Sequence, residues 1–412
     1  MKSQYMRDVS PTMMDALEDK SIFKAFVDYV RDSEELALCF RGNDTEIGKV
    51  IIYKNNHMIW ELCYKYGKPR VVINPNHARF MKKWLEIVKK LMDECRFRGP
   101  HGEEFSQLND DNGFVKRHES EKKYSYDAIR LEYEPKGTYE DVYDVVDRSY
   151  SLLSQMQESY FNPEHTEIFD VYHPVSKKFK KEERPRNYIK QYYFECHSDA
   201  ETDDNNKAFY SNFQKCVEKH VQQDLFMNNH VLKNGLFIYD LEFEQPGNVP
   251  GVEIKSKNKP DMFGIRFDSK GNPFSICMIE VKSTPSALKQ NSGLEEHLKG
   301  MEEYLGIKKK DGTLMGDRIK EARLILNQYK RLGFYGVKRE YSESDFKGLK
   351  KEIVFVFTGE LALDRIIHRN YTLRGKKMSK VTIKDVLEGY DDYNEIKVGQ
   401  DWGNFVAVKR EY

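Results

Sequence analysis

Short apolar runs separated by turn-forming residues dominate the first part of the chain. Four of these runs lie at 36–40, 49–53, 58–64 and 70–73, divided by RGNDTEIG, KNN and KYGK. Such spacing predicts an antiparallel meander. Apolar residues then recur at helical spacing over 77–95 and 139–160, which predicts helices beside the sheet. We therefore expect a smaller N-terminal α+β lobe.

A different order of patterns fills the C-terminal half. Helical spacing is found over 207–227, 294–305 and 317–332, and apolar strands are expected at 235–243, 353–357 and around 402–408. Between the first helix and the second lies a stretch of strand, turn and strand. This order predicts an α/β domain (α+β for the chain as a whole) with a mixed sheet flanked by helices.

The stretch over 259–284, KPDMFGIRFDSKGNPFSICMIEVKST, predicts a β-hairpin with DSKGNP as its turn. Pairing the two strands outward from the turn puts Asp261 opposite Glu280. Because strand side chains alternate, Glu280 and Lys282 point to the same side. A one-residue bulge would break this register. The pattern predicts two carboxylates and a lysine at one end of the strand pair.

Such a cluster is suited to metal-dependent chemistry on a phosphate. Two facing carboxylates repel each other unless a positive charge lies between them. Mg²⁺ prefers a few hard oxygen ligands and keeps waters for itself and for a phosphate substrate. A lysine beside the metal can orient or help to deprotonate a water and can stabilise charge on the phosphate.

Pro260-Asp261, followed by Glu280-Val281-Lys282 on the next strand, resembles the PD-(D/E)xK signature of the restriction-endonuclease-like superfamily. The resemblance implies a restriction-endonuclease-like core that cleaves nucleic acid with Mg²⁺, for which Mn²⁺ can substitute. It implies Asp261, Glu280 and Val281 as metal ligands and Lys282 as the catalytic lysine. The competing interpretation is a structural ion-pair cluster, since Glu-x-Lys triplets are common in a chain that is 33% charged.

The predicted helix over 207–227 offers two further acids. In the superfamily this helix often contributes an acidic residue to the site, and Glu218 matches that arrangement. Helical-wheel placement instead puts Asp224 near the middle of the apolar stripe. We select Glu218 as a further catalytic residue and keep Asp224 as the alternative. Exonuclease-like branches carry Gln four residues before a Tyr, whereas Gly300 precedes Tyr304 here, so no branch is assigned.

Charge balance restricts how a nucleic acid could be bound. The 67 basic and 67 acidic residues cancel, so contacts to phosphates would depend on local basic patches. The candidate nucleic-acid-binding residues are Lys308, Lys309, Lys310, Arg374, Lys376 and Lys377.

The six cysteines lack CxxC spacing, which is typical of reduced packing residues in a cytoplasmic protein. No apolar signal core or membrane-spanning run is found in the sequence.

A length of 412 residues favours two domains. We expect an N-terminal lobe over 1–165 for recognition, regulation or dimerisation, a charged linker over 166–206, and a nuclease-like domain over 207–412. The predicted activity is a Mg²⁺-dependent deoxyribonuclease, with endonuclease action and DNA favoured over RNA, in restriction, repair or defence. Members of the superfamily often act as dimers, so a homo-oligomer is a candidate state. The alternative is an inactive nuclease-like module that binds nucleic acid or a protein partner.

Overall fold

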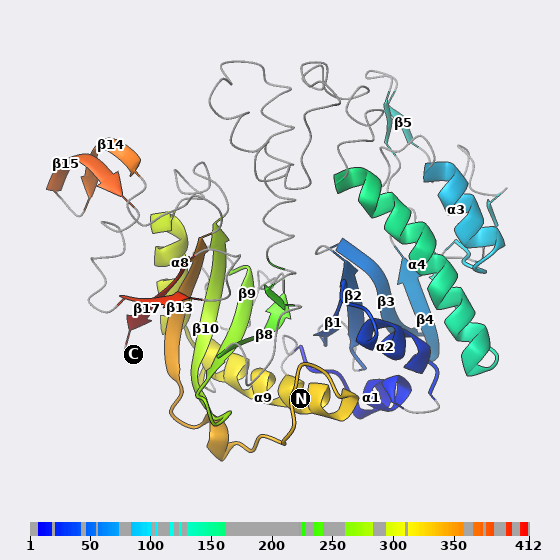
Figure 1. The fold of residues 1–412 in the computed structure, drawn as a ribbon, viewed down its shortest axis with the longest axis horizontal. Coiled ribbons are helices and arrows are strands. Elements are labelled where there is room, and N and C mark those ends of the chain that lie inside the picture. The colour runs from blue at the N-terminus through cyan, green and yellow to red at the C-terminus, as the bar shows by residue number, and fades with distance from the viewer. Residues whose placement is uncertain are drawn as a thin grey trace. The chain divides into compact units, whose positions relative to one another are not determined.

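The computed structural model is mixed α/β and contains an antiparallel sheet and a mixed sheet flanked by helices (Figure 1). The structure describes residues 7–18, 21–42, 47–54, 57–73, 84–99, 130–161, 235–241, 260–282, 294–309, 312–357, 366–373, 376–382, 393–397 and 404–410, with short pieces at 102, 104–105, 116–118, 123–125, 222 and 225–226.

The chain forms two compact units, and one of them is discontinuous in sequence. The N-terminal unit comprises Val9–Leu38 and Thr45–Phe213. The C-terminal unit comprises Met1–Asp8, Cys39–Asp44 and Gln214–Tyr412. Two early segments of the chain therefore belong to the C-terminal unit. The predicted boundaries at 165 and 206 fall outside the described residues and stay a prediction.

The N-terminal unit is built on the predicted meander. Its sheet has the order β1-β2-β3-β4-β7, and β2, β3, β4 and β7 pair antiparallel. The elements are α1 (Pro11–Leu17), α2 (Lys24–Arg31), β1 (Leu36–Arg41), β2 (Lys49–Lys54), β3 (His57–Lys65), β4 (Lys68–Ile73), α3 (Trp84–Asp93), β5 (Lys116–His118), β6 (Lys123–Ser125), β7 (Leu131–Tyr133) and α4 (Tyr139–Phe161). The four predicted strands and the helix over 139–160 are confirmed. The predicted helix over 77–95 is described only from Trp84 to Asp93.

Trp60 anchors the core of the N-terminal unit. Its side chain is fully buried, with its ring edge-to-face against Phe26 of α2 at 5.4 Å between centroids. Its indole Nε1 donates to Ser149 Oγ of α4 at 3.2 Å. A buried indole N–H needs such a partner. The ring contact with Phe26 and the hydrogen bond to Ser149 thereby hold α2 and α4 against the Trp60 side chain.

The C-terminal unit contains the mixed sheet, in the order β16-β17-β13-β10-β9-β8. Its elements are β8 (Leu236–Leu241), β9 (Met262–Phe267), β10 (Pro273–Lys282), α8 (Leu294–Gly306), β11 (Lys308–Lys309), β12 (Gly312–Thr313), α9 (Leu314–Leu332), the 3₁₀ helix η7 (Ser344–Phe346), β13 (Lys350–Phe357), β14 (Ile366–Leu373), β15 (Lys376–Thr382), β16 (Tyr393–Lys397) and β17 (Asn404–Arg410). β10 pairs parallel with β13 and antiparallel with β9. A parallel pair needs a crossover, which α8 and α9 lie within.

Helices α8 and α9 pack on the face of the sheet that carries Glu280. His297 of α8 contacts Glu280, and Tyr329 of α9 contacts Phe237 of β8, which shares that face through Ile265 and Ile276. Tyr304 of α8 contacts Phe263 of β9, with ring centroids 6.0 Å apart. Phe263 is paired with Met278 of β10, so the two share a face with Glu280, two residues further along β10. Burial of this apolar face holds α8 against the strand end that carries the candidate chemistry.

Several elements were not expected from the sequence. β14 and β15 form a separate two-stranded hairpin where only a basic region was expected, and β16 extends the mixed sheet. The basic loop over 308–313 contains the two-residue strands β11 and β12. Of the predicted helix over 207–227, the structure describes only Gln222, Leu225 and Phe226, which are helical. The predicted strands over 353–357 and around 402–408 correspond to β13 and β17 and are confirmed.

A buried ionic cluster joins the early segments of the chain to the C-terminal core. It consists of Arg7, Arg41, Asp240, Arg318 and Glu321, all at most 6% exposed. Arg7 and Arg41 both donate to the Asp240 carboxylate. The Arg318 guanidinium lies 2.9 Å from Glu321 Oε2, which also accepts the Arg7 main-chain N–H at 2.6 Å. Three guanidinium groups and two carboxyl groups thus satisfy one another away from water.

Candidate active site

The β9–β10 ladder brings Asp261 and Glu280 to facing positions. The antiparallel register runs from Ser275 paired with Arg266 to Ile279 paired with Met262, and its one irregularity falls beside the turn. One step beyond the last pair, Asp261 comes opposite Glu280. This is the register predicted from the sequence. Asp261 therefore comes just before β9, level with the end of β10 that carries Glu280.

The turn that sets this register is tightly hydrogen bonded. The main-chain N–H of Asp268 donates to the carbonyl of Asn272 at 2.9 Å, and the Asp268 carboxylate accepts the N–H groups of Lys270 and Asn272 at 2.9 and 2.8 Å. Gly271 has φ of 78°, a conformation that residues with a Cβ rarely adopt. The DSKGNP sequence therefore fixes where the two strands begin to pair.

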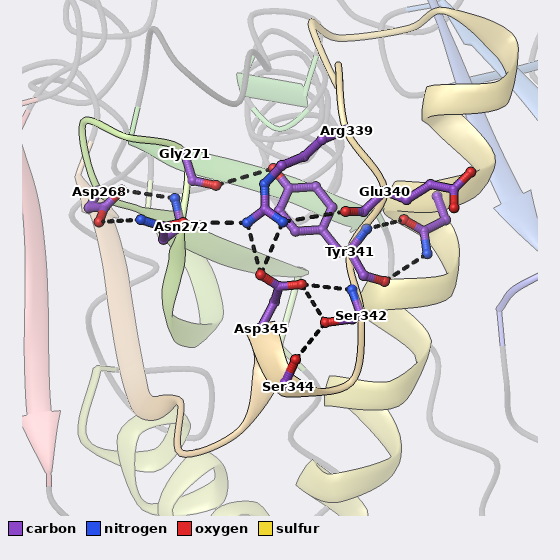
Figure 2. Close-up of polar contacts among 10 residues, drawn as sticks. Asp268, Gly271, Asn272, Arg339, Glu340, Tyr341, Ser342, Ser344 and Asp345 are labelled. Atoms are coloured by element: carbon purple, nitrogen blue, oxygen red, sulfur yellow. Dashed lines mark hydrogen bonds and ion pairs between the residues drawn. The ribbon is translucent and has the colours of Figure 1, made fainter.

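Residues after α9 hold the same turn in place. Figure 2 shows the Arg339 guanidinium between the carboxylate of Asp345, at 3.0 Å, and the side-chain oxygen of Asn272, at 3.4 Å. The guanidinium also lies 4.2 Å from the centre of the Tyr341 ring, whose hydroxyl donates to the Gly271 carbonyl at 3.3 Å. The end of the hairpin opposite Glu280 is thus tied to the core, which restricts strand slippage.

Asp261 ends the β9–β10 ladder with its side chain. Its Oδ2 accepts the main-chain N–H of Val281 at 2.8 Å. This bond fixes the carboxylate against β10, beside Glu280. Val281 is fully buried and apolar, so only its main-chain carbonyl oxygen could act as a metal ligand.

The two oxygens of Glu280 have unlike surroundings. Oε1 lies 2.6 Å from Nζ of Lys282 and 2.6 Å from Nδ1 of His297. Oε2 is buried, and none of the residues that the structure describes donates a hydrogen bond to it. A buried charged acceptor without a partner is costly, by more than about 1–3 kcal/mol. An oxygen in this state is suited to a cation.

Glu280 is ionised in this setting. The residue is 2% exposed, and burial alone raises the pKa of its carboxyl group. The charge of Lys282 and the hydrogen bond from His297 lower that pKa by more, so the net result lies below the usual value. The site therefore holds a carboxylate at neutral pH, which is the form that binds a metal ion.

His297 was missed by the sequence analysis. It lies on α8, and its partner Glu280 is on β10, so no local spacing links the two. One signal was available: His297 follows Leu294 by three residues and precedes Leu298, both fully buried, which places it at the edge of the apolar stripe that faces the sheet. A polar ring at that edge can reach the end of a strand.

The donor set fits a hard divalent cation. Glu280 Oε2, the Asp261 carboxylate and the Val281 carbonyl oxygen would hold it, and Mg²⁺ needs only one or two carboxylates besides its waters and a phosphate. In the described part of the chain, no group of three or more His, Cys, Asp and Glu side chains is arranged to hold a metal ion. The pair of Asp261 and Glu280 is smaller than such a group.

The remaining predicted site residues are not brought to this cluster by the described structure. Glu218, its alternative Asp224, Lys310 and Arg374 lie outside the described residues. Lys308, Lys376 and Lys377 are exposed, and Lys309 belongs to β11. These lysines lie on two-stranded sheets separate from the six-stranded sheet.

Comparison with known proteins does not assign this chain to a family. No family model, curated protein or solved structure matches this chain. Within the described residues, no helix has the length and apolar character needed to cross a membrane.

Proposed function

We propose that this protein is a metal-dependent nuclease that hydrolyses phosphodiester bonds, with DNA favoured as substrate. The observation that carries the proposal is the buried Oε2 of Glu280, which no described residue hydrogen bonds, on the strand end that Asp261 caps through the Val281 N–H. Two carboxylates with a lysine at one sheet end also support the resemblance to the PD-(D/E)xK superfamily.

Each side chain has a distinct part in this reaction. Asp261 and Glu280 would hold Mg²⁺, which when bound acidifies a water and neutralises charge on the phosphate. Lys282 carries its ammonium two residues from Glu280 on the same face, where it would orient the attacking water and stabilise the charge that develops on the phosphate. The water oxygen would bond to phosphorus as the bond from phosphorus to the leaving sugar oxygen breaks; the water would lose a proton to solvent, and the leaving oxygen would take one up.

A second candidate is a nuclease-like module that binds without cleaving. The 2.6 Å contact between Lys282 Nζ and Glu280 Oε1 favours it, because a buried ammonium already balances the charge of the carboxylate. The two candidates differ in metal dependence. A structural cluster binds no Mg²⁺, whereas a catalytic one binds it at Glu280 Oε2.

The proposal is tested with purified protein on linear duplex, closed circular duplex, single-stranded DNA and RNA, in Mg²⁺ or Mn²⁺. We expect cleavage that is lost with EDTA and in the variants Lys282→Ala and Asp261→Asn. Lys270→Ala, an exposed lysine at the turn of the same hairpin, is the matched control and should cut normally. Cleavage that survives EDTA or Lys282→Ala would contradict the proposal, and nicking of closed circles would establish endonuclease action.

A further inference from the structure

His297 joins helix α8 to the carboxylate at the centre of the candidate site. Its Nδ1 lies 2.6 Å from Glu280 Oε1, and its side chain is 16% exposed. A carboxylate can only accept, so Nδ1 must carry the hydrogen of this bond. The contact is therefore a directed N–H···O bond from a ring on one element to an acid on another.

We infer that His297 is a positioning residue of this site: by holding Glu280 Oε1, it leaves Oε2 as the oxygen that would bind the cation. This inference rests on the metal site of the proposed nuclease and adds to it a residue outside the Asp, Glu and Lys of the sequence motif. It assigns α8 a part in metal binding as well as in packing.

The two ends of the Glu280 carboxylate would otherwise be equivalent. The last torsion of a glutamate side chain is broad and nearly two-fold, so its oxygens exchange unless neighbours restrain them. Lys282 donates from a flexible four-carbon stem. The imidazole of His297 is rigid, and the buried Leu294, Leu298 and Met301 of α8 fix its backbone against the sheet. His297 is accordingly the stronger restraint on the carboxylate.

Lys282 and His297 both donate to Glu280 Oε1, so one of them can move away while the other still holds the carboxylate. Lys282 can serve a phosphate only if its ammonium turns at least partly away from Glu280. When it does so, His297 still occupies Oε1, and the carboxylate keeps its orientation. The lysine could then act on substrate while the carboxylate stays in place. Groups that orient a metal ligand in this way typically change affinity or activity by about 10–100-fold when removed.

The test measures Mn²⁺ binding directly, from the electron paramagnetic resonance signal of free Mn²⁺ titrated into full-length protein. We expect His297→Ala to weaken Mn²⁺ affinity by about 10–100-fold. His297→Asn should stay within about threefold of wild type, because the asparagine side-chain N–H lies where Nδ1–H does; that ratio is about 0.7 kcal/mol at 1.4 kcal/mol per factor of ten. Lys299→Ala, exposed on the same helix, is the matched control and should bind normally.

Three outcomes separate this inference from the proposed activity. Equal Mn²⁺ affinity in wild type and His297→Ala would overturn it, as would a wild type that binds no Mn²⁺. Wild type that binds Mn²⁺ but cuts no nucleic acid would overturn the nuclease and leave the inference supported. If His297→Ala does not fold, His297→Leu keeps the volume, removes the donor and answers the same question. Lys282→Ala should lose cleavage. It should keep Mn²⁺ affinity, because the variant removes a positive charge that repels the cation.

Discussion

Nε of Arg7 donates to Oδ2 of Asp240 at 3.2 Å, across 233 residues of sequence. Both side chains are buried, and Arg41 shares the same carboxylate. This bond makes a segment near the start of the chain a structural part of the C-terminal unit. Its contribution to stability does not depend on any activity of the protein.

Replacing Asp240 with Asn should strongly destabilise the protein. Arg7 and Arg41 would then face a neutral amide in a buried position, and breaking a buried pair typically costs about 3–5 kcal/mol. Asp144→Asn is the control, because Asp144 pairs with Arg148 on the exposed surface of α4 and such pairs contribute about 0.3–0.5 kcal/mol. Urea unfolding measures both. Equal costs for the two variants would show that the buried cluster adds no stability.

A fragment over 207–412 should fold poorly even though it contains the whole mixed sheet. It lacks Arg7 and Arg41, so Asp240 loses both of the cations that contact it in the described cluster. We expect the fragment to lack the cooperative thermal transition of the full chain, measured by near-ultraviolet circular dichroism. Adding Asp240→Asn to the fragment should recover part of the transition. A fragment that unfolds cooperatively at the temperature of the full chain would contradict this.

Stability should fall as pH rises from about 5 to 8 because of Glu321. Burial raises the pKa of its carboxyl group from 4.5 to about 8, against the charge of Arg318. Between pH 4.5 and about pH 8, Glu321 of the folded protein keeps a proton that the unfolded chain has lost. The contribution of Glu321 to the free energy of unfolding is therefore complete below pH 4.5 and declines toward pH 8. The decline is at most about 1.4 kcal/mol per pH unit. In Glu321→Gln this contribution is absent, and urea unfolding should show a shallower decline. Parallel curves would exclude Glu321 as the cause.

Magnesium should stabilise the wild-type protein against unfolding. Binding only to the folded state adds about 2.7 kcal/mol at 100 times the dissociation constant. Glu280→Gln should abolish the Mg²⁺-dependent rise in melting temperature. Glu352→Gln is the control: Glu352 is also buried, but it pairs with Cys277 on the opposite face of the sheet and should keep the rise. A rise that persists in Glu280→Gln would place the metal elsewhere.

The exposed lysines of β15 should contribute to nucleic-acid binding without reading sequence. In a Lys282→Ala background, which prevents cleavage, Lys376→Ala with Lys377→Ala should weaken duplex binding. It should also reduce the slope of log affinity against log salt by about one for each phosphate that the protein no longer neutralises. Lys338→Ala with Lys347→Ala removes two exposed lysines from another part of the unit. An equal weakening in that control would mean that the effect is one of net charge.

The hairpin could be predicted from the sequence because its information is local. Turn residues show where the hairpin reverses, and alternation shows which side chains of each strand share a face. At the turn Phe267 pairs with Pro273, and a shift of one residue before Ser275 brings the ladder to the predicted register from there onward. The same alternation predicted that Lys282 lies on the side of the strand that carries Glu280, and Lys282 Nζ lies 2.6 Å from Glu280 Oε1.

The interactions that could not be predicted are long-range. His297 reaches Glu280 from a helix, and Arg7 reaches Asp240 from a segment far away in sequence. Periodicity shows which face of an element is buried but not which polar groups meet at its edge. The hairpin of β14 and β15 was missed because its basic composition indicated a charged surface more strongly than its short pattern indicated strands.

The discontinuous C-terminal unit has a consequence for the order in which the protein can fold during synthesis. Arg7 and Arg41 leave the ribosome long before their partner Asp240 is made, and Glu321 follows later still. The residues of the N-terminal unit, over 9–38 and 45–213, are all available by then. That unit can therefore form first. The two arginines stay hydrated until β8 and α9 have been synthesised. A chain released before that point can fold its N-terminal unit but cannot assemble the unit that carries the candidate nuclease site.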